Sequence, residues 1–391
     1  MTTTFLKAKK ILDGRGGAKD HAGIVVSGGR IREILPSAPD GAETIDYGDA
    51  TILPGLINAH AHIDTPPVLK TVEWITGVGK AEHVIETVRN LEQTLASGVT
   101  YVRNMGSRDM VDLEVKAAVE KGLVQGPGIV TCGRMLCMTG GHGNFIGLES
   151  DGVDECRKHT RQLLKAGVGH VKFMASGGIL TPGSVAGREE FTFEEVAAIV
   201  DEAHKAGRKT AVHASGTPNV LKALKAGTDS VEHGYDIDDA CRELMVKQGT
   251  YLVPTLAPAW FFVQYGREAG IPAYIFEDRG ESSLELQRES FRKAVEAGVR
   301  IATGSDAGTP FNGHGSLAVE IRLMVEAGMR PSDAIVASTW GGADLLGIGK
   351  DLGSIEAGKA ADLLVVDGDP LENISVLEKP LGVWKDGKKI F

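Results

Sequence analysis

Two patterns of apolar and polar positions alternate along this chain. In its middle part, helical stretches end in a glycine and a short apolar, β-branched strand begins at once, at joints such as Ser97-Gly98-Val99, Ala166-Gly167-Val168 and Ala297-Gly298-Val299. Glycine just past a helix end commonly takes the left-handed conformation that stops the helix. Short apolar strands that alternate with helices indicate a parallel sheet covered by helices.

The number of these units favours a closed barrel. Two strands are predicted near His60 and Ile129, and six more at residues 99–105, 171–175, 210–213, 230–232, 251–253 and 300–303. About eight units over roughly 290 residues fit an α/β fold of the (β/α)8 TIM barrel type, with its active site at the carboxyl ends of the strands. An open doubly wound sheet is the alternative, but no Gly-x-Gly-x-x-Gly motif follows the first strand.

The two ends of the chain have a different pattern, of short strands separated by turns. Residues 24–31 are a predicted hairpin with a Gly-Gly turn, and residues 383–390 are a second one with an Asp-Gly tip. An isolated hairpin is only marginally stable in water. We therefore predict one small β-sandwich domain built from residues 1–55 plus 351–391, and a barrel domain of residues 56–350.

Composition narrows the classes of partner. The 391 residues carry a net charge of -10, and no cluster of lysine and arginine resembles a phosphate-binding surface. No apolar run approaches the roughly 20 residues that span a bilayer, and the first residues lack the apolar core of a secretory signal. The four cysteines have no Cys-x-x-Cys spacing, which is typical of reduced thiols. We expect a cytoplasmic protein that binds neither nucleic acid nor membrane.

Polar side chains follow five of the predicted strands. His60 and His62 are two residues apart, so in a strand they project from the same face. The other strand ends contribute Lys172, His213, His233 and Asp306. Each residue alone is more often an ordinary core or turn residue. Together, at one end of one barrel, imidazoles and a carboxylate suit Zn²⁺ or a related divalent ion.

Lys172 is the unusual member of this set because it lies inside an apolar strand. Burying a charged ammonium without a partner is costly, and a protonated lysine would repel a metal ion. A lysine neutralised by burial can add CO₂ to form an anionic carbamate, whose two oxygens can bridge two ions. The alternative is that Lys172 pairs with a core Asp or Glu.

Sequence motifs surround these residues at 54–62 (Pro-Gly-Leu-Ile-Asn-Ala-His-Ala-His), 171–178, 212–214, 231–234, 304–310 and 353–366. By these motifs, which extend over nearly the whole chain, it is identified as a member of the amidohydrolase superfamily. More narrowly, it resembles the imidazolonepropionase-related group that contains Xaa-Pro dipeptidases and arginine or lysine carboxypeptidases.

The resemblance implies a binuclear zinc centre with ligands His60, His62 and Asp306 for the more buried ion, His213 and His233 for the second, and carboxylated Lys172 as the bridge. It also implies hydrolysis of an amide or peptide-like C–N bond by a hydroxide shared between the ions, with Asp306 as general base and acid. The expected substrate is a small molecule, such as a dipeptide or N-acyl amino acid, and the expected assembly is a homo-oligomer.

Other functions stay open at this point. A mononuclear deaminase or a cyclic-amide, imidazolone-type hydrolase would lack the bridging lysine, so Lys172 favours the binuclear interpretation. Aryl amides and carbamates are further candidate substrates, because residues 258–283 form a long connection rich in aromatic residues. A non-enzymatic assembly protein that kept only the fold is disfavoured, because all the proposed ligands are present.

Loop residues are the candidates for substrate contact. His142, in the glycine-rich stretch 138–144, is predicted to bind the substrate carbonyl, as in related peptidases with a similar Gly-Gly-His-Gly motif. Prolidase-like relatives place a tyrosine two residues after the fifth-strand histidine, where this chain has Ser215. Tyr235, two residues after His233, is a candidate replacement from the next strand.

Three more residues are candidates near the mouth of the barrel. His314 follows the eighth strand, in Phe-Asn-Gly-His-Gly. Arg103 and Arg134 come near strand ends, where a guanidinium can bind a substrate carboxylate bidentately. The alternative for both arginines is an ion pair within the scaffold.

Overall fold

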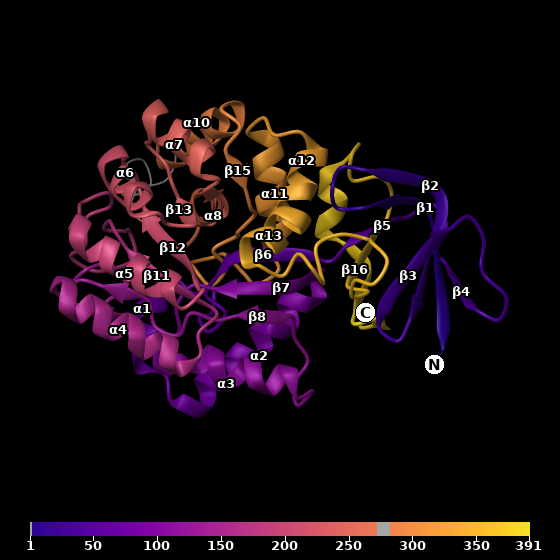
Figure 1. The fold of residues 1–391 in the computed structure, drawn as a ribbon, viewed down its shortest axis with the longest axis horizontal. Helices are drawn as coiled ribbons and strands as arrows, with labels where there is room; N and C mark the ends of the chain where they lie inside the picture. Colours follow the sequence, from indigo (N-terminus) through magenta and orange to yellow (C-terminus); the bar gives the residue numbers. More distant parts are fainter. Residues whose placement is uncertain (1, 272–281) are drawn as a thin grey trace.

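The computed structural model describes residues 2–271 and 282–391, and its larger part is a barrel of parallel strands (Figure 1). The barrel strands are β6 (Leu56–Ala61), β7 (Val99–Asn104), β8 (Gly128–Val130), β11 (His170–Met174), β12 (Lys209–Ala214), β13 (Ser230–His233), β14 (Tyr251–Val253) and β15 (Arg300–Ile301). All paired neighbours among them are parallel. Two short strands, β9 (Leu136–Cys137) and β10 (Leu148–Glu149), extend the sheet beside β11.

Backbone hydrogen bonds close the barrel at two junctions. The N–H groups of Gly169 and His170 donate to the carbonyl of Thr131, at 2.7 and 3.1 Å, which joins the end of β8 to β11. The N–H of Asp306 donates to the carbonyl of His60 at 2.8 Å, which joins β6 to the residues after β15. The predicted (β/α)8 fold is therefore confirmed.

Helices surround the strands on the outside of the barrel (Figure 1). They are α1 (Thr71–Gly77), α2 (Lys80–Ala96), η1 (Arg108–Met110), α3 (Val111–Glu120), α4 (Gly152–Ala166), α5 (Phe193–Lys205), α6 (Thr217–Ala226), α7 (Asp239–Gln248), α8 (Ala257–Tyr265), α10 (Ser282–Glu296), α11 (Leu317–Glu326), α12 (Pro331–Val336), η3 (Ala337–Gly341) and α13 (Gly342–Leu346). The predicted glycine stops have left-handed φ angles of 89° at Gly98, 92° at Gly167 and 80° at Gly298, a conformation that favours glycine.

Strands from both ends of the chain form one eight-stranded sheet beside the barrel. They are β1 (Thr3–Leu12), β2 (Ala18–Ser27), β3 (Arg30–Leu35), β4 (Glu43–Asp46), β5 (Thr51–Pro54), β16 (Leu363–Val366), β17 (Pro380–Lys385) and β18 (Lys388–Lys389). The short helix η4 (Ile374–Glu378) lies between β16 and β17 in the chain. Both predicted hairpins are present, as β2–β3 and β17–β18. A bridge between Arg30 and Ala360 joins β3 to the segment before β16, so the sheet folds back on itself.

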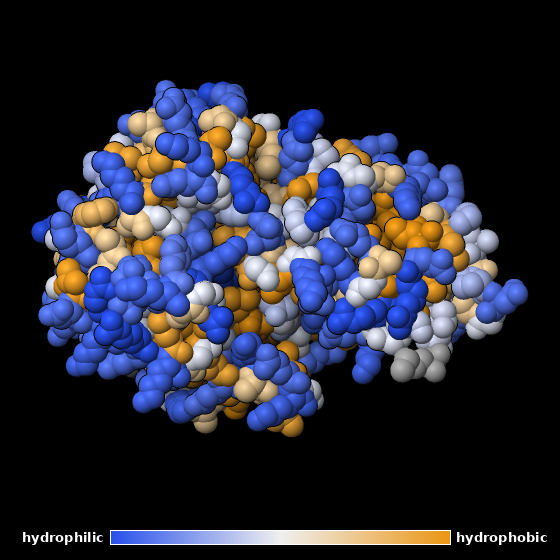
Figure 2. Space-filling view, viewed as in Figure 1, coloured by the Kyte–Doolittle hydropathy of each residue, from blue (hydrophilic) through white to orange (hydrophobic). Residues whose placement is uncertain are grey.

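The terminal sheet leads directly into the first barrel strand. β5 continues into β6 through Gly55, whose N–H donates to the carbonyl of Asp362 at 2.8 Å. Close approach of β6 and the residues after β15 depends on Gly304, where a Cβ atom would lie 2.5 Å from the Cβ of His60. Hydrophilic side chains cover most of the visible face, with smaller apolar patches between them (Figure 2). None of the described helices is long and apolar enough to cross a membrane.

Candidate metal centre and active site

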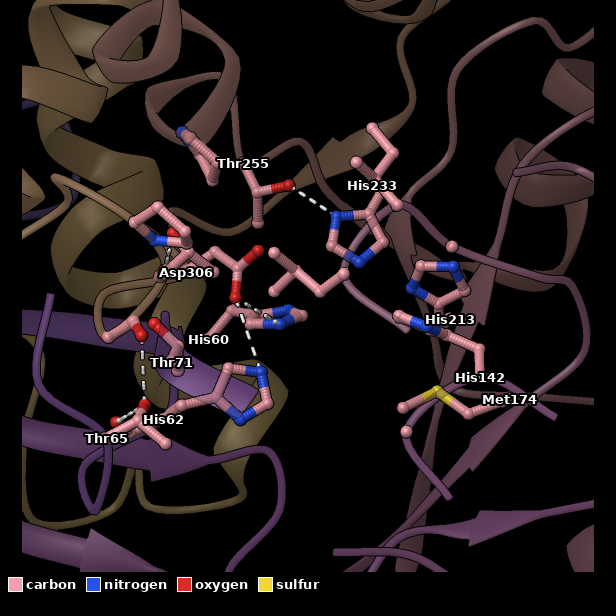
Figure 3. Close-up of a pocket in the computed structure, with 18 of the residues that line it drawn as sticks. His60, His62, Thr65, Thr71, His142, Met174, His213, His233, Thr255 and Asp306 are labelled. Carbon is pink, nitrogen blue, oxygen red and sulfur yellow. Dashed lines mark hydrogen bonds and ion pairs between the residues drawn. The ribbon is translucent and has the colours of Figure 1, made fainter. Parts of the chain in front are cut away.

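All six predicted metal ligands line one cavity at the carboxyl ends of the barrel strands. The cavity has a volume of about 360 Å³, and the ligands that line it are His60, His62, Lys172, His213, His233 and Asp306. Figure 3 shows His60, His62 and Asp306 on one side of the cavity and His213, His233 and His142 on the other. We call the first three the first group and His213 with His233 the second group.

The first group is compact. The Nε2 atoms of His60 and His62 lie 3.3 and 3.4 Å from the same oxygen of Asp306, Oδ1. This oxygen is buried and has no hydrogen-bond partner among the described residues. Asp306 has a left-handed φ of 53°, a strained conformation of the kind that persists where surrounding structure enforces it. An orphaned oxygen beside two imidazole nitrogens fits a divalent ion, which would satisfy all three donors at once.

A buried carboxylate behind His60 sets the orientation of that ring. Glu232 Oε2 lies 2.8 Å from His60 Nδ1, and Glu232 Oε1 accepts hydrogen bonds from Arg103 at 2.8 Å and Ser230 at 2.5 Å. Burial opposes ionisation of Glu232, but Arg103 and His60 hold its pKa at about 2. The ionised carboxylate accepts a hydrogen bond from the Nδ1–H group of His60. The ring then presents a free Nε2 lone pair to the cavity, as in other carboxylate–histidine–metal arrangements.

In the second group, a neutral hydroxyl rather than a carboxylate holds the histidine His233. His233 Nδ1 lies 2.6 Å from the hydroxyl of Thr255, and the ring centroids of His213 and His233 are 4.5 Å apart. Burial lowers the pKa of both rings well below 6.5, so both are neutral and able to ligate a metal. His233 has a φ of 69°, which breaks the alternation of the strand and lets Glu232 and His233 both face the interior.

Lys172 lines the same cavity as these groups and is buried to 1 % exposure. Among the described residues, no carboxylate lies within ion-pair distance of its Nζ and no hydrogen bond to it is formed, so the core ion pair considered above is not present. Burial lowers the pKa of Lys172 to about 8, although Glu232 and Asp306 favour its charged form. A lysine with this pKa is partly neutral near pH 8 and therefore nucleophilic.

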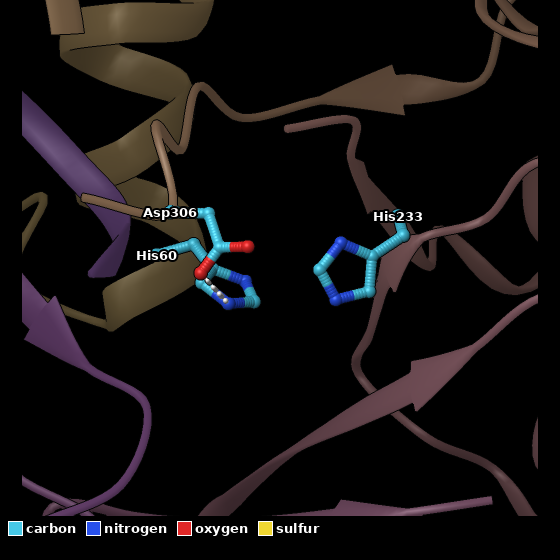
Figure 4. A group of neighbouring side chains, drawn as sticks. All are labelled: His60, His233 and Asp306. Atoms are coloured by element: carbon cyan, nitrogen blue, oxygen red, sulfur yellow. Dashed lines mark ion pairs between the residues drawn. The ribbon is translucent and has the colours of Figure 1, made fainter. Parts of the chain in front are cut away.

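Ligand atoms from both groups lie close enough to share an ion. One ligand atom each from His60, His233 and Asp306 can be chosen so that all lie within 4.8 Å of one another (Figure 4). Neutral imidazoles, an ionised carboxylate and a neutralised lysine form a donor set suited to Zn²⁺ and similar ions. The residues present thus fit the metal that the superfamily resemblance implies.

His142 lies against the second group, with its ring centroid 4.6 Å from that of His213. Its Nδ1 is 2.9 Å from the hydroxyl oxygen of Thr181, which accepts a hydrogen bond from the N–H of Gly143 at 2.8 Å. The Thr181 hydroxyl therefore holds His142 Nδ1, and Nε2 forms no hydrogen bond among the described residues. Burial lowers the pKa of His142 to about 4, so the ring is neutral.

The other residues predicted to contact substrate differ in whether they line the cavity. Tyr235 lines the cavity, but His314 and Arg134 do not. His314 is buried beneath it, with its Nε2 2.9 Å from the carbonyl of Thr65. Arg134 donates to the carbonyls of Ile146 and Gly147. Neither side chain lines the described cavity, so their contact with substrate stays a prediction that this cavity does not support. The Nδ1 of His314 is buried without a hydrogen-bond partner among the described residues.

Arg103 takes the scaffold alternative. It lies inside the barrel, 2 % exposed, where it binds Glu232 and the carbonyl of Ala59. In the aromatic connection, Phe262 lines the cavity, whereas Tyr274 and Phe276 lie outside the described residues. Sequence reasoning gave Glu232 no role. Its signal was the one that exposed Lys172, a charged residue within an apolar strand.

The geometry defines a class of protein, a barrel hydrolase with a metal centre at the carboxyl ends of its strands. Residues 51–390 match the model of the amidohydrolase family. The chain belongs to this family.

Comparisons with individual proteins agree with this assignment. A crystal structure of a Xaa-Pro dipeptidase with bound methionine is 34 % identical, covers 99 % of both chains and superposes with a TM-score of 0.92. A prolidase complexed with N-methylphosphonate-L-proline is 29 % identical over 100 % of this chain and 99 % of its own, with a TM-score of 0.91. The ochratoxinase of Aspergillus niger is 27 % identical over 98 % of this chain and 86 % of its own length. The chain is thus a metal-dependent hydrolase that acts on C–N bonds.

Proposed function

We propose that this protein hydrolyses an amide bond of a small molecule at a binuclear zinc centre bridged by carboxylated Lys172. The observation that carries the proposal is the pair of facing ligand groups with a buried lysine, without an ion-pair partner among the described residues, in the lining of the same cavity. His60, His62 and Asp306 would hold one ion, and His213 and His233 the other. When bound, the ions would polarise the substrate carbonyl and lower the pKa of the attacking water.

The lysine is proposed to become a carbamate because this modification removes an unfavourable charge. The neutral Nζ attacks CO₂ and loses a proton, which yields an anion in place of a cation. A cation between two metal ions would repel both, whereas an anion with two oxygens can face both groups. Burial of Lys172 without a carboxylate partner supports this chemistry.

Asp306 is proposed to carry the proton. With Oδ1 beside the Nε2 atoms of His60 and His62 as the metal ligand, the second oxygen, Oδ2, would accept a proton from the attacking water. The carbonyl carbon gains an oxygen, the C–N bond breaks, and Asp306 returns the proton to the leaving nitrogen. One amide and one water give one carboxylic acid and one amine, and Asp306 ends as it began.

His142 is proposed to stabilise the developing oxyanion. Thr181 holds the Nδ1 side of the ring, the tautomer with its proton on Nε2 would be the donor, and the low pKa keeps the ring neutral across the physiological range. A preorganised donor of this kind typically contributes a factor of about 100 to 1000 to kcat.

Relatives suggest two substrate classes. The Xaa-Pro dipeptidase and prolidase neighbours favour dipeptides, and the ochratoxinase relative favours an ochratoxin-like compound. The test is a panel of both classes with zinc-loaded protein, followed by product formation. Hydrolysis of one amide class with Asp306→Asn inactive would support the proposal. Release of ammonia from an aminated heterocycle without cleavage of any amide, or no turnover by any loaded preparation, would contradict it.

A further inference from the structure

The wall of the cavity has a different character from its floor. The floor carries the histidines, Lys172 and Asp306, whereas the wall is formed largely by apolar side chains, among them Leu69, Met135, Phe145, Ile179, Pro258 and Phe262. Pro258 and Phe262 belong to helix α8 and the others to loops that follow different strands, so the apolar wall extends around the ligand groups.

Charged groups are almost absent from this wall. Among the described lining residues, Lys172 and Asp306 are the only ones that carry a lysine, arginine, aspartate or glutamate side chain, and both belong to the proposed metal centre. The remaining polar lining consists of threonines together with Tyr235 and Gln287. None of these side chains supplies a cation for a substrate carboxylate or an anion for a substrate ammonium.

Two described arginines near this wall, Arg108 and Arg134, do not line the cavity. Arg108 and Arg134 line a smaller recess that shares Phe145 and Ile146 with the main cavity. Arg108 Nη1 donates to the carbonyl of Val78 at 3.0 Å, and Arg134 Nε donates to that of Ile146 at 3.0 Å. Both guanidinium groups are therefore held by backbone carbonyls behind the wall.

Ser215 reinforces this pattern. It follows the second-group histidine His213 by two residues, is buried to 1 % exposure, and its hydroxyl has no partner among the described residues. It does not line the cavity. The strand end next to His213 therefore presents no side-chain donor to a bound carboxylate.

We infer that the enzyme selects amides that are neutral and apolar on both sides of the scissile bond, and discriminates against those with a free carboxylate or ammonium beside it. This inference rests on the proposed function. Outside the proposed metal centre, a charged terminus would find no oppositely charged side chain in the described lining. Lost hydration without such a partner is costly in an apolar environment.

A matched pair of substrates tests the inference. N-benzoylphenylalanine and N-(2-phenylethyl)benzamide have the same rings and the same amide bond and differ only by one carboxylate. We expect kcat/KM of the zinc-loaded enzyme to be about tenfold or more higher for the neutral member. The same preference is expected in binding, measured by calorimetry with both compounds on Asp306→Asn protein, which needs no turnover.

Surface substitutions sharpen the test. Ile179 lines the cavity and is 46 % exposed, whereas Val185, on the same loop, is 59 % exposed and does not line it. Ile179→Arg should raise binding of the carboxylate compound several-fold and narrow the preference, and Val185→Arg should leave it unchanged. Leu69→Arg, at 47 % exposure in the lining, and Val68→Arg, at 40 % outside it, form a second matched pair.

The outcomes separate this inference from the proposed function. Equal or better turnover and binding of the carboxylate compound would overturn the inference while leaving the amide hydrolase in place. Loss of all amide hydrolysis with a retained binding preference for the neutral compound would contradict the proposed function and support the apolar selectivity of the cavity. An equal response of Ile179→Arg and Val185→Arg would also overturn the inference, because the effect would then come from surface charge alone.

Discussion

The two ligand groups of the candidate metal centre are built differently. In the first group, His60 is held by Glu232, which is held in turn by Arg103 and Ser230, and all four side chains are buried. In the second group, His233 is held by the single hydroxyl of Thr255. A charged hydrogen bond orients a ligand more strongly than a neutral one.

This difference predicts that the two groups bind their metal ions with different affinities. The first group is preorganised and should bind its ion tightly, because little reorganisation is needed when the ion enters. The second group has no carboxylate beside its histidines and would depend on the proposed Lys172 carbamate for negative charge. We therefore expect unequal affinities at the two sites.

Asp306→Asn should have the largest effect, because it removes both a ligand and the proposed proton carrier. We expect kcat to fall by about a thousandfold or more. Asp236→Asn is the matched control, since Asp236 is exposed and has a φ of 58° close to the 53° of Asp306. Equal activity of the two variants would exclude Asp306 from catalysis.

His142→Asn should lower kcat by about 100-fold, by removal of the oxyanion donor beside the second group. The pKa of His142 is about 4, below its ordinary value, so the ring gains a proton only as the pH falls toward 4. A pH–rate profile should therefore show no loss of activity from this ring between pH 8 and about pH 5. A strong fall near pH 6.5 that disappears in His142→Asn would contradict the neutral-donor role.

Glu232→Gln should act on the first group. The neutral amide is a weaker acceptor than the carboxylate for the Nδ1–H group of His60, and it leaves Arg103 without its buried charged partner. We therefore expect metal affinity to fall by about 10- to 100-fold. A chelator titration that resolves two binding steps measures this loss. Glu82→Gln, at an exposed position on α2, is the control, and an equal change in both variants would remove Glu232 from the metal centre.

Thr255→Val should have the smallest effect, confined to the second group. Valine keeps the branched shape of threonine but removes the hydroxyl that lies 2.6 Å from His233 Nδ1. We expect the weaker binding step to shift by about tenfold and the tighter one to stay unchanged. A shift of the tighter step instead would show that the two groups do not act separately.

Much of this architecture could be predicted from sequence. The glycine stops and the apolar strands defined the barrel, and the ligands followed because the carboxyl ends of parallel strands meet at one mouth. Lys172 was recognisable because a lone charge in an apolar strand needs an explanation. Glu232 carried the same signal but was passed over beside the more prominent His233.

Loop residues were harder to place. His142 reaches the cavity and His314 does not, although both occupy glycine-rich loops near strand ends. Their positions depend on the paths of long loops and on contacts such as Thr181 with His142 and the Thr65 carbonyl with His314. These contacts join residues far apart in the chain, and no local pattern specifies them.

Metal content of the wild-type protein and of Lys172→Ala, measured with activity on the same samples, tests the central claim most directly. The account predicts about two ions per wild-type chain, and in Lys172→Ala the loss of the weaker ion together with most of the activity. Partial recovery is expected when a short carboxylate such as propionate takes the place of the carbamate. One ion in a fully active wild-type chain, or two ions retained by Lys172→Ala, would contradict the bridged binuclear centre.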